Sequence, residues 1–292
     1  METRTEHQMA KLILDFARAD DRVRIVAMNG SRADPHARRD IFQDYDIACF
    51  VTEVEPFRDE KPILSHFGPA ILIQKPEEHA WPPPVGDGRY NYNMLLADGN
   101  RIDLSFFALE QLAERITDSL TRLLLDKDGL VPDLPPPSAR DSFTRPPTRK
   151  LYEDCCNEFF FGLGAHVPKT IWRRQLPLFK HYVEIVLRRP LLLMFAWEIA
   201  GRSDFEISIG KGGKHLRHHL DPDSWGDYER THTGADWDQA WESLFIFHRL
   251  FKQSAGAVAR RHRFRFPEAD SARVLAFLEH VRTLPPDAAA LF

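Results

Sequence analysis

The chain has 292 residues, which is enough for two domains by the usual size of a folding unit. Hydrophobic residues make up 43% and charged residues 28%, a composition that excludes an intrinsically disordered protein. The formal net charge of −4 argues against a nucleic acid as the main partner, because phosphate contacts need a basic excess, and it suits a cationic small molecule.

The expected compartment follows from three further features. The three cysteines have no metal-ligand spacing, which favours a reducing environment. Residues 1–16 are charged throughout and do not resemble a signal peptide. The longest apolar run, 190–197, is too short to span a bilayer. We therefore expect a soluble cytoplasmic protein with no membrane partner, acting as a monomer or a weak dimer.

The N-terminal half mixes helix and strand patterns. Apolar residues at three- and four-residue spacing predict helices, and short apolar runs predict strands. A turn at 97–100 predicts a hairpin. In chain order we expect a helix over 6–18, strands over 23–29 and 44–51, a helix over 56–67, a strand over 70–74, a hairpin over 90–107, a helix over 108–116 and a strand over 121–127.

The composition changes near residue 131. Six prolines between 131 and 148, without periodicity, predict a linker or a wrapping segment. The remaining chain has helical spacing over 149–162, 168–188, 190–200, 236–253 and 268–283. We therefore predict an α+β chain with an N-terminal α/β domain, a linker and a C-terminal all-α helical bundle, spanning 1–132, 133–148 and 149–292.

Two aspartates one residue apart, Asp44 and Asp46, stand at the start of the strand over 44–51. Residues i and i+2 of a strand point the same way, so both carboxylates aim at one point, as hard divalent cations require. Asp103 is a third carboxylate, on an otherwise apolar strand. If the strands are neighbours, the triad could hold two Mg²⁺ ions that orient a triphosphate. Alternatively, Asp44 caps a strand and Asp103 ends a turn.

A turn of small residues, Gly30-Ser31-Arg32, ends the strand over 23–29. Gly30 lets the backbone approach a ligand, Ser31 offers a hydroxyl, and Arg32 offers a fork of donors for phosphate oxygens. In isolation such a turn would have no special meaning. Beside a metal-binding carboxylate pair, a phosphate-binding turn is typical of a nucleotidyl-transfer site.

A second candidate phosphate site is the loop 208–216, where glycines interleave with Lys211 and Lys214. It is similar to an anion-binding loop that enters a helix, although the P-loop spacing is absent. Either lysine could reach a triphosphate. The alternative is a turn between helices with solvated lysines.

The acceptor side of the site is less well marked. His181 and Glu184, on the helix over 168–188, are candidates for the general base that removes a proton from an acceptor hydroxyl. Acidic or aromatic side chains are candidates for contact with a cationic ligand, and these are Trp81, Tyr90, Glu153, Glu158 and Trp172. For each of them, packing or plain helix surface is the alternative.

Several longer motifs occur in a characteristic order. They are MNGSR (28–32), QDYDIACFVT (43–52), GNRIDLSFF (99–107), CCNEFF (155–160), VPKTIWRRQL (167–176), SIGKGGK (208–214) and WESLFIFHRLF (241–251). In this order the chain resembles the aminoglycoside 6-adenylyltransferases, the streptomycin-modifying nucleotidyltransferases. The resemblance covers almost the whole chain, and the glycine-serine and Asp-x-Asp parts are shared by the wider nucleotidyltransferase superfamily.

The resemblance implies a polymerase-β-like nucleotidyltransferase domain with a mixed sheet, in which Asp44, Asp46 and Asp103 bind metal. It implies transfer of AMP from ATP, with Mg²⁺, to a hydroxyl of streptomycin or a related aminoglycoside, releasing pyrophosphate. The chain departs from the expected pattern in having no aspartate on the helix over 168–188. Two alternatives remain open: another small-molecule or protein acceptor, and a non-catalytic nucleotide-binding module.

Overall fold

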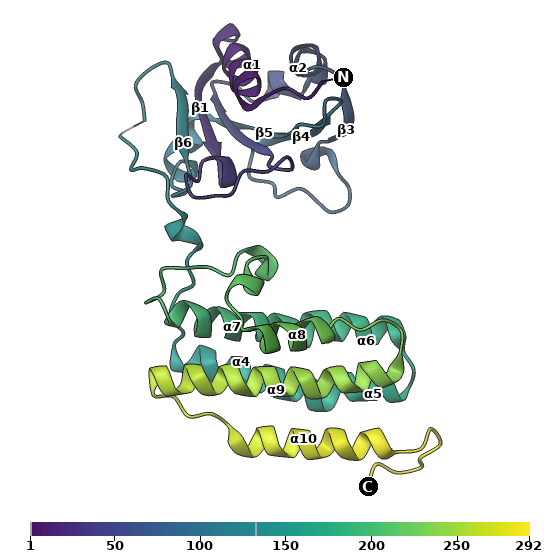
Figure 1. Cartoon of the computed structure of the whole chain (residues 1–292). Coiled ribbons are helices and arrows are strands. Elements are labelled where there is room, and N and C mark those ends of the chain that lie inside the picture. Colours follow the sequence, from purple (N-terminus) through teal and green to yellow (C-terminus); the bar gives the residue numbers. More distant parts are fainter. Residues whose placement is uncertain (1, 132) are drawn as a thin grey trace. The chain divides into compact units, whose positions relative to one another are not determined.

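The computed structural model describes residues 2–131 and 133–292, which form two compact units, Met1–Asp141 and Ser142–Phe292 (Figure 1). The division lies inside the segment predicted as a linker. Part of this segment is bonded to the first unit, because Asp141 accepts a hydrogen bond from Ser119 N at 2.8 Å and its own amide donates to Ser119 Oγ at 3.1 Å. Over the described ranges, no helix has the length and apolar character needed to cross a membrane.

The first unit is built on a six-stranded mixed sheet in the order β3-β4-β5-β2-β1-β6. β2 and β5 are parallel, and all other neighbouring strands are antiparallel. The strands are β1 (Val23–Asn29), β2 (Tyr45–Val51), β3 (Ala70–Gln74), β4 (Tyr90–Leu96), β5 (Arg101–Ala108) and β6 (Arg122–Asp126). The predicted strands and the α+β class are confirmed, and the two strands that carry Asp46 and Asp103 lie side by side at the centre.

Two helices, α1 (Glu6–Ala19) and α2 (Glu60–Phe67), cover one face of this sheet (Figure 1). Their buried residues pack with Tyr45 and Ile47 of β2 and with Ile102 and Leu104 of β5 in one apolar cluster. Because side chains alternate along a strand, Asp46 and Asp103 project from the opposite face. The hydrophobic pattern of β2 and β5 therefore decides on which side of the sheet the carboxylates lie.

Two helices of the first unit are shorter than the periodicity predicted. The segment 56–67 contains a 3₁₀ turn, Glu55–Arg58, followed by α2. α2 begins after Asp59 because the Asp59 carboxylate accepts a hydrogen bond from Lys61 N at 3.1 Å, which satisfies a free amide of the first turn. The segment 108–116 forms a 3₁₀ turn, Leu109–Gln111, and the single α-helical turn α3 (Leu112–Arg115).

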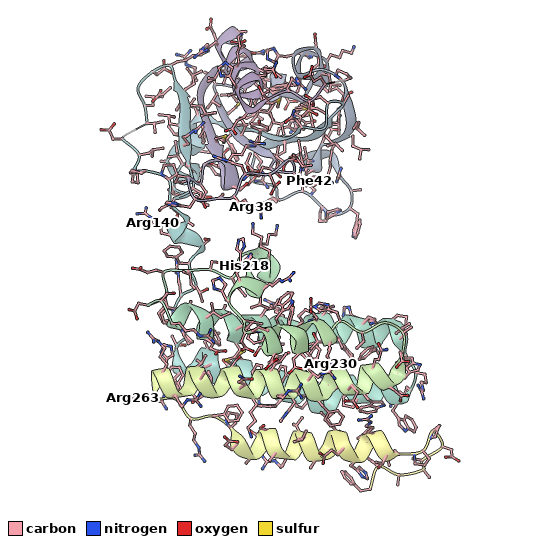
Figure 2. All side chains as sticks on the ribbon, in the orientation of Figure 1. Arg38, Phe42, Arg140, His218, Arg230 and Arg263 are labelled. Carbon is pink, nitrogen blue, oxygen red and sulfur yellow. The ribbon has the colours of Figure 1, made fainter. Side chains whose placement is uncertain are left out.

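The second unit is helical, as predicted. Its α-helices are α4 (Arg149–Phe161), α5 (Val167–Trp172), α6 (Leu176–Tyr182), α7 (Arg189–Gly201), α8 (Pro222–Arg230), α9 (Trp237–His262) and α10 (Glu268–Thr283). The rings of Phe159 on α4 and Phe251 on α9 stack with centroids 3.8 Å apart in the core. α9 extends past the predicted end at 253, because its stripe of buried residues continues to Ala259, and it stops at the left-handed residue Arg263 (Figure 2).

The prediction of one helix over 168–188 and a separate helix over 190–200 is wrong. The first of these is broken after α5, where Arg174 has a left-handed backbone (φ +56°), and α6 starts with Pro177 in its first turn. The chain then runs from α6 through the π-helical segment Val183–Arg188 directly into α7. Pro190 has no amide hydrogen, and the wider π turn before it accommodates that loss without ending the helix.

The N-terminal segment is attached to the β4–β5 hairpin through Asp98, whose side chain is fully buried. Its carboxylate accepts hydrogen bonds from Arg4 Nε at 2.5 Å and Asn100 Nδ2 at 3.0 Å. Arg4 Nη1 also donates to Phe67 O at 2.9 Å. Burial alone would raise the pKa of Asp98, but these donors outweigh burial and hold the pKa well below its usual range.

Asp98→Asn should lower the free energy of unfolding by about 1.5–3 kcal/mol at pH 7, because the amide loses a charge-assisted bond to Arg4. The pKa is lower in the folded state than in the unfolded chain, where it is about 3.9. The stabilising contribution is therefore fully present above about pH 5, shrinks as the pH falls below 4, and is lost only as the pH falls through the lower pKa of the folded state. Urea titrations at pH 7 and pH 3 measure this. An equal destabilisation at both pH values would assign the effect to packing instead of charge.

Candidate active site

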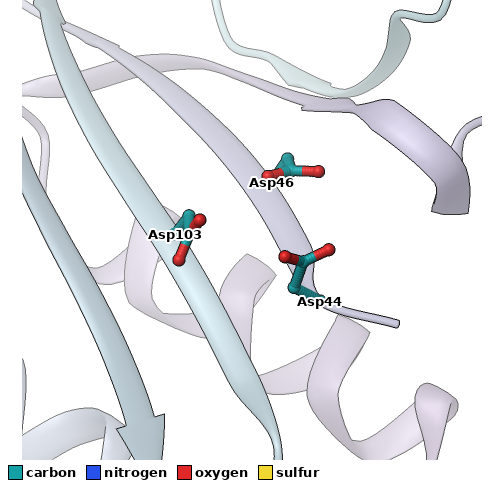
Figure 3. A group of neighbouring side chains, drawn as sticks. All are labelled: Asp44, Asp46 and Asp103. Atoms are coloured by element: carbon teal, nitrogen blue, oxygen red, sulfur yellow. The ribbon is translucent and has the colours of Figure 1, made fainter. Parts of the chain in front are cut away.

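Three carboxylates converge on the face of the sheet opposite α1 and α2 (Figure 3). In the parallel β2–β5 pair, Asp46 is the register partner of Asp103, and Asp44 lies directly before β2. One ligand oxygen from each of the three residues lies within 4.8 Å of the other two, and all three side chains are half-buried. Within the described part of the chain, this is the one group of three or more His, Cys, Asp or Glu residues close enough to hold a metal ion.

Asp46 is electrostatically the most unusual member of this group. Burial, reinforced by the negative charges of Asp44 and Asp103, raises the pKa of Asp46 to about 6, and the nearby Arg101 opposes this shift. Three carboxylates in one place, opposed by a single guanidinium, leave an excess of negative charge. All-oxygen donors with excess negative charge suit a hard divalent cation such as Mg²⁺.

The guanidinium of Arg101 is a part of the site that the sequence analysis missed. Arg101 Nε and Nη2 donate to the two oxygens of Asp103 at 3.1 and 2.6 Å, and Nη1 lies 3.4 Å from Asp44 Oδ2. The i, i+2 rule that joined Asp44 to Asp46 applies equally to Arg101 and Asp103 on β5. The signal was therefore present in the segment 101–103.

The turn after β1 packs directly against the triad. Gly30 has a left-handed backbone (φ +71°), and a Cβ added there would lie 2.3 Å from Asp46 Oδ2. Glycine is thus required for two reasons, the backbone conformation and the close approach of the carboxylate. The Ser31 hydroxyl is half-buried and has no hydrogen-bond partner among residues 2–131 and 133–292. It is available for a ligand.

Arg32 differs from the sequence-based expectation of a fork of donors facing phosphate. Its side chain is buried, Nη2 donates to Gln43 O at 2.7 Å, and Nε donates to Asp44 O at 3.0 Å. The guanidinium carbon also lies 3.8 Å from the centroid of the Tyr45 ring. Arg32 therefore fixes the backbone that presents Asp44, and tertiary contacts occupy the donors that the sequence made available.

Two aromatic candidates have very different surroundings. Tyr90 is fully buried and its hydroxyl donates to the Glu78 carboxylate, so its expected role as a substrate contact is incompatible with the structure. Burial and this hydrogen bond raise the pKa of Tyr90. Trp81 is 86% exposed. The loop that leads to Asp44 also carries an exposed aromatic residue, Phe42 (Figure 2).

The candidates in the helical unit do not form one cluster. The Glu184 carboxylate accepts a hydrogen bond from the buried Arg188 at 2.7 Å, and His181 is exposed one turn earlier. Trp172 Nε1 donates to Pro285 O at 3.2 Å. Glu153 lines a cavity of about 760 Å³ between α4 and α10, and Glu158 is exposed on α4.

The lysine-containing loop does not enter an α-helix. Lys211 and Lys214 are exposed, and the loop forms two short 3₁₀ turns, Lys211–Gly213 and Leu216–His218. The expectation of a helix amino terminus behind this loop is wrong, because so short a turn lacks the aligned peptide dipoles of a helix. Gly210 and Gly212 have positive φ, which explains the glycines through the turn itself.

The amino-acid sequence matches the family model described as streptomycin adenylyltransferase over residues 3–281. An aminoglycoside 6-adenylyltransferase of Bacillus subtilis (strain 168) is 33% identical over 270 residues, which cover 91% of this chain and 94% of that protein. A protein with the same description from Campylobacter jejuni is 32% identical over 268 residues, covering 91% and 92%. A crystal structure of an aminoglycoside 6-adenyltransferase from Bacillus subtilis is 29% identical, with a TM-score of 0.47 and coverage of 96% of this chain and 100% of that chain. The chain therefore belongs to the streptomycin adenylyltransferase family of nucleotidyltransferases.

Proposed function

We propose that the protein transfers AMP from ATP to a hydroxyl of streptomycin or a related aminoglycoside and releases pyrophosphate. The observation that carries this proposal is the triad Asp44, Asp46 and Asp103 beside the Gly30–Ser31 turn, in a chain that matches the family over nearly its whole length. The names of the relatives supply the acceptor class. The net charge of −4 is compatible with a polycationic acceptor.

The triad fits a divalent cation by the chemistry of its donors. Its three carboxylates supply only oxygen ligands, and their ligand atoms lie within 4.8 Å of one another. We propose that Asp44, Asp46 and Asp103 hold Mg²⁺, with two ions as the expected number. When bound, the cation supplies positive charge that neutralises phosphate oxygens of ATP and of the leaving pyrophosphate.

The chemical step requires the acceptor and the nucleotide to be held in line. The acceptor oxygen forms a bond to the α-phosphorus, and the bond from that phosphorus to the oxygen bridging the β-phosphate breaks. The bonding electron pair leaves with pyrophosphate, and the acceptor proton passes to a base. In this scheme the Ser31 hydroxyl donates a hydrogen bond to a phosphate oxygen. Gly30 permits the turn to lie close to the Asp46 carboxylate, and Arg32 holds the backbone of Asp44 in place.

The remaining candidate groups come from the helical unit, except Trp81, which belongs to the first unit. His181 and Glu184 remain the candidate bases, and Lys211 or Lys214 would bind the triphosphate. Glu184 is held by the buried Arg188, whereas His181 is exposed. Acidic and aromatic side chains with exposed surface would contact the cationic acceptor, and these are Trp81, Glu153, Glu158 and Trp172.

Pyrophosphate release should require ATP, Mg²⁺ and streptomycin together. A coupled pyrophosphate assay with each component omitted in turn, and mass spectrometry of the product for the added AMP, measures this. A panel of other aminoglycosides tests the acceptor class. Absence of pyrophosphate with every aminoglycoside would overturn the acceptor assignment, and binding of ATP without turnover on any acceptor would favour a non-catalytic nucleotide-binding module.

A further inference from the structure

Arg101 makes a contact with the triad that the proposed chemistry does not use. It starts β5, and its guanidinium bonds to both oxygens of Asp103 and lies 3.4 Å from Asp44 Oδ2. One cation therefore pairs with two of the three carboxylates and offsets part of their charge. The ion pairs of Arg101 are with Asp44 and Asp103, whereas Asp46 feels its charge only from a longer distance.

The ion pairs of Arg101 with Asp44 and Asp103 lie at the protein surface, where breaking them costs little free energy. The Arg101 side chain is 52% exposed, whereas Asp44 and Asp103 are 28% and 22% exposed. Half-exposed ion pairs contribute little net stability, because water compensates for the lost contact. The arginine side chain is also long and flexible, so the guanidinium can leave while the carboxylates stay fixed by β2 and the start of β5.

Arg101 and a metal ion compete for the same atoms. A divalent cation held by the triad would take one oxygen of each residue, and the guanidinium already donates to both oxygens of Asp103 and faces an oxygen of Asp44. Two cations at one set of oxygens repel each other strongly at such short distances. Binding of the metal therefore favours departure of the guanidinium.

We propose that Arg101 is a displaceable counter-ion, which pairs with Asp44 and Asp103 before the metal binds and moves to a phosphate group of the nucleotide once the metal is in place. This inference rests on the proposed function, because it takes the triad to be a divalent cation site. A planar guanidinium suits both partners, since carboxylate and phosphate oxygens both accept its paired donors. The exchange offsets part of the negative charge of the carboxylates before the metal binds, and part of the charge of the nucleotide afterwards.

The test measures two binding affinities by calorimetry in the absence of the acceptor, one for Mn²⁺ alone and one for ATP at saturating Mg²⁺. Arg101→Gln should bind Mn²⁺ alone about three- to tenfold more tightly than the unchanged protein, because a competitor is gone. The same variant should bind ATP at saturating Mg²⁺ about tenfold more weakly, because a phosphate donor is gone. A residue with a merely structural role would weaken both affinities. Arg101→Lys keeps the charge without the paired donors, so its affinities for Mn²⁺ and ATP should lie between those of Arg101→Gln and the unchanged protein.

The control is Arg24→Gln, since Arg24 makes a similar two-pronged pair with Asp128 at the β1 and β6 side of the sheet, where the two side chains are 24% and 33% exposed. It should leave both affinities unchanged. Unchanged or weaker Mn²⁺ binding by Arg101→Gln, in a protein that otherwise binds Mn²⁺, overturns the competition and leaves the proposed function standing. Unchanged ATP affinity overturns the transfer to phosphate. Absence of Mn²⁺ binding from both proteins overturns the metal site itself, and with it the proposed mechanism.

Discussion

Asp46→Asn should reduce the rate of pyrophosphate release at least about a thousandfold, which corresponds to a loss of several kcal/mol of transition-state stabilisation. Asp46 lies opposite Asp103 in the β2–β5 register and packs against Gly30. Asparagine preserves the size of the side chain but removes a negative charge and a carboxylate oxygen from the proposed metal site. Steady-state rates with ATP, Mg²⁺ and streptomycin measure the effect. The control Asp15→Asn, on the exposed Lys11 pair of α1, should retain full activity.

The same substitution should stabilise the metal-free protein. Burial raises the pKa of Asp46 to about 6 in the folded state. Ionising this carboxyl therefore costs more free energy in the folded protein than in the unfolded chain. For a raised acid pKa, the unfavourable contribution is absent below the pKa of the unfolded chain and complete above the folded pKa. Asp46→Asn should therefore raise the free energy of unfolding by about 1–2 kcal/mol at pH 8 and by little at pH 4. Denaturant titrations with a chelator measure this.

The two readouts together distinguish a functional carboxylate from a structural one. A variant that is inactive and less stable would have lost activity through its fold, and the metal role would lose its support. A variant that keeps turnover would contradict the proposed mechanism whatever its stability. Loss of activity together with gained stability is expected where like charges are kept together for a ligand.

Gly30→Ala should reduce activity at least about a hundredfold, because the added methyl group would lie 2.3 Å from Asp46 Oδ2 and must displace that carboxylate. The positive φ of +71° adds a backbone cost of about 1–2 kcal/mol to folding. The rate of pyrophosphate release and the unfolding free energy, measured on the same preparation, separate these two effects.

Gly129→Ala is the matched control for the backbone cost. Gly129 has a similar φ of +64°, and a Cβ there would have no neighbour within 4 Å. It should lose a similar amount of stability and keep its activity. If both variants lost activity equally, backbone strain would be sufficient to explain the Gly30 result. If neither lost activity, the position of the Asp46 carboxylate would not matter for turnover.

The sequence by itself determined the features that depend on near neighbours in the chain. Alternation over 44–51 is a property of any strand, so it placed Asp44 and Asp46 on one side without knowledge of the fold. Apolar spacing located the strands of the sheet and most helices. Local geometry is encoded locally, which is why these predictions required no tertiary information.

The tertiary structure decided everything that joins distant segments. Only the parallel pairing of β2 with β5 sets Asp103 beside Asp46, and only that pairing brings Arg101 to Asp44. Arg32 and Tyr90 look equally available in the sequence, yet the fold assigns one to backbone carbonyls and buries the other against Glu78. Which donor meets which acceptor depends on packing across long sequence separations, and no periodicity in the chain encodes that choice.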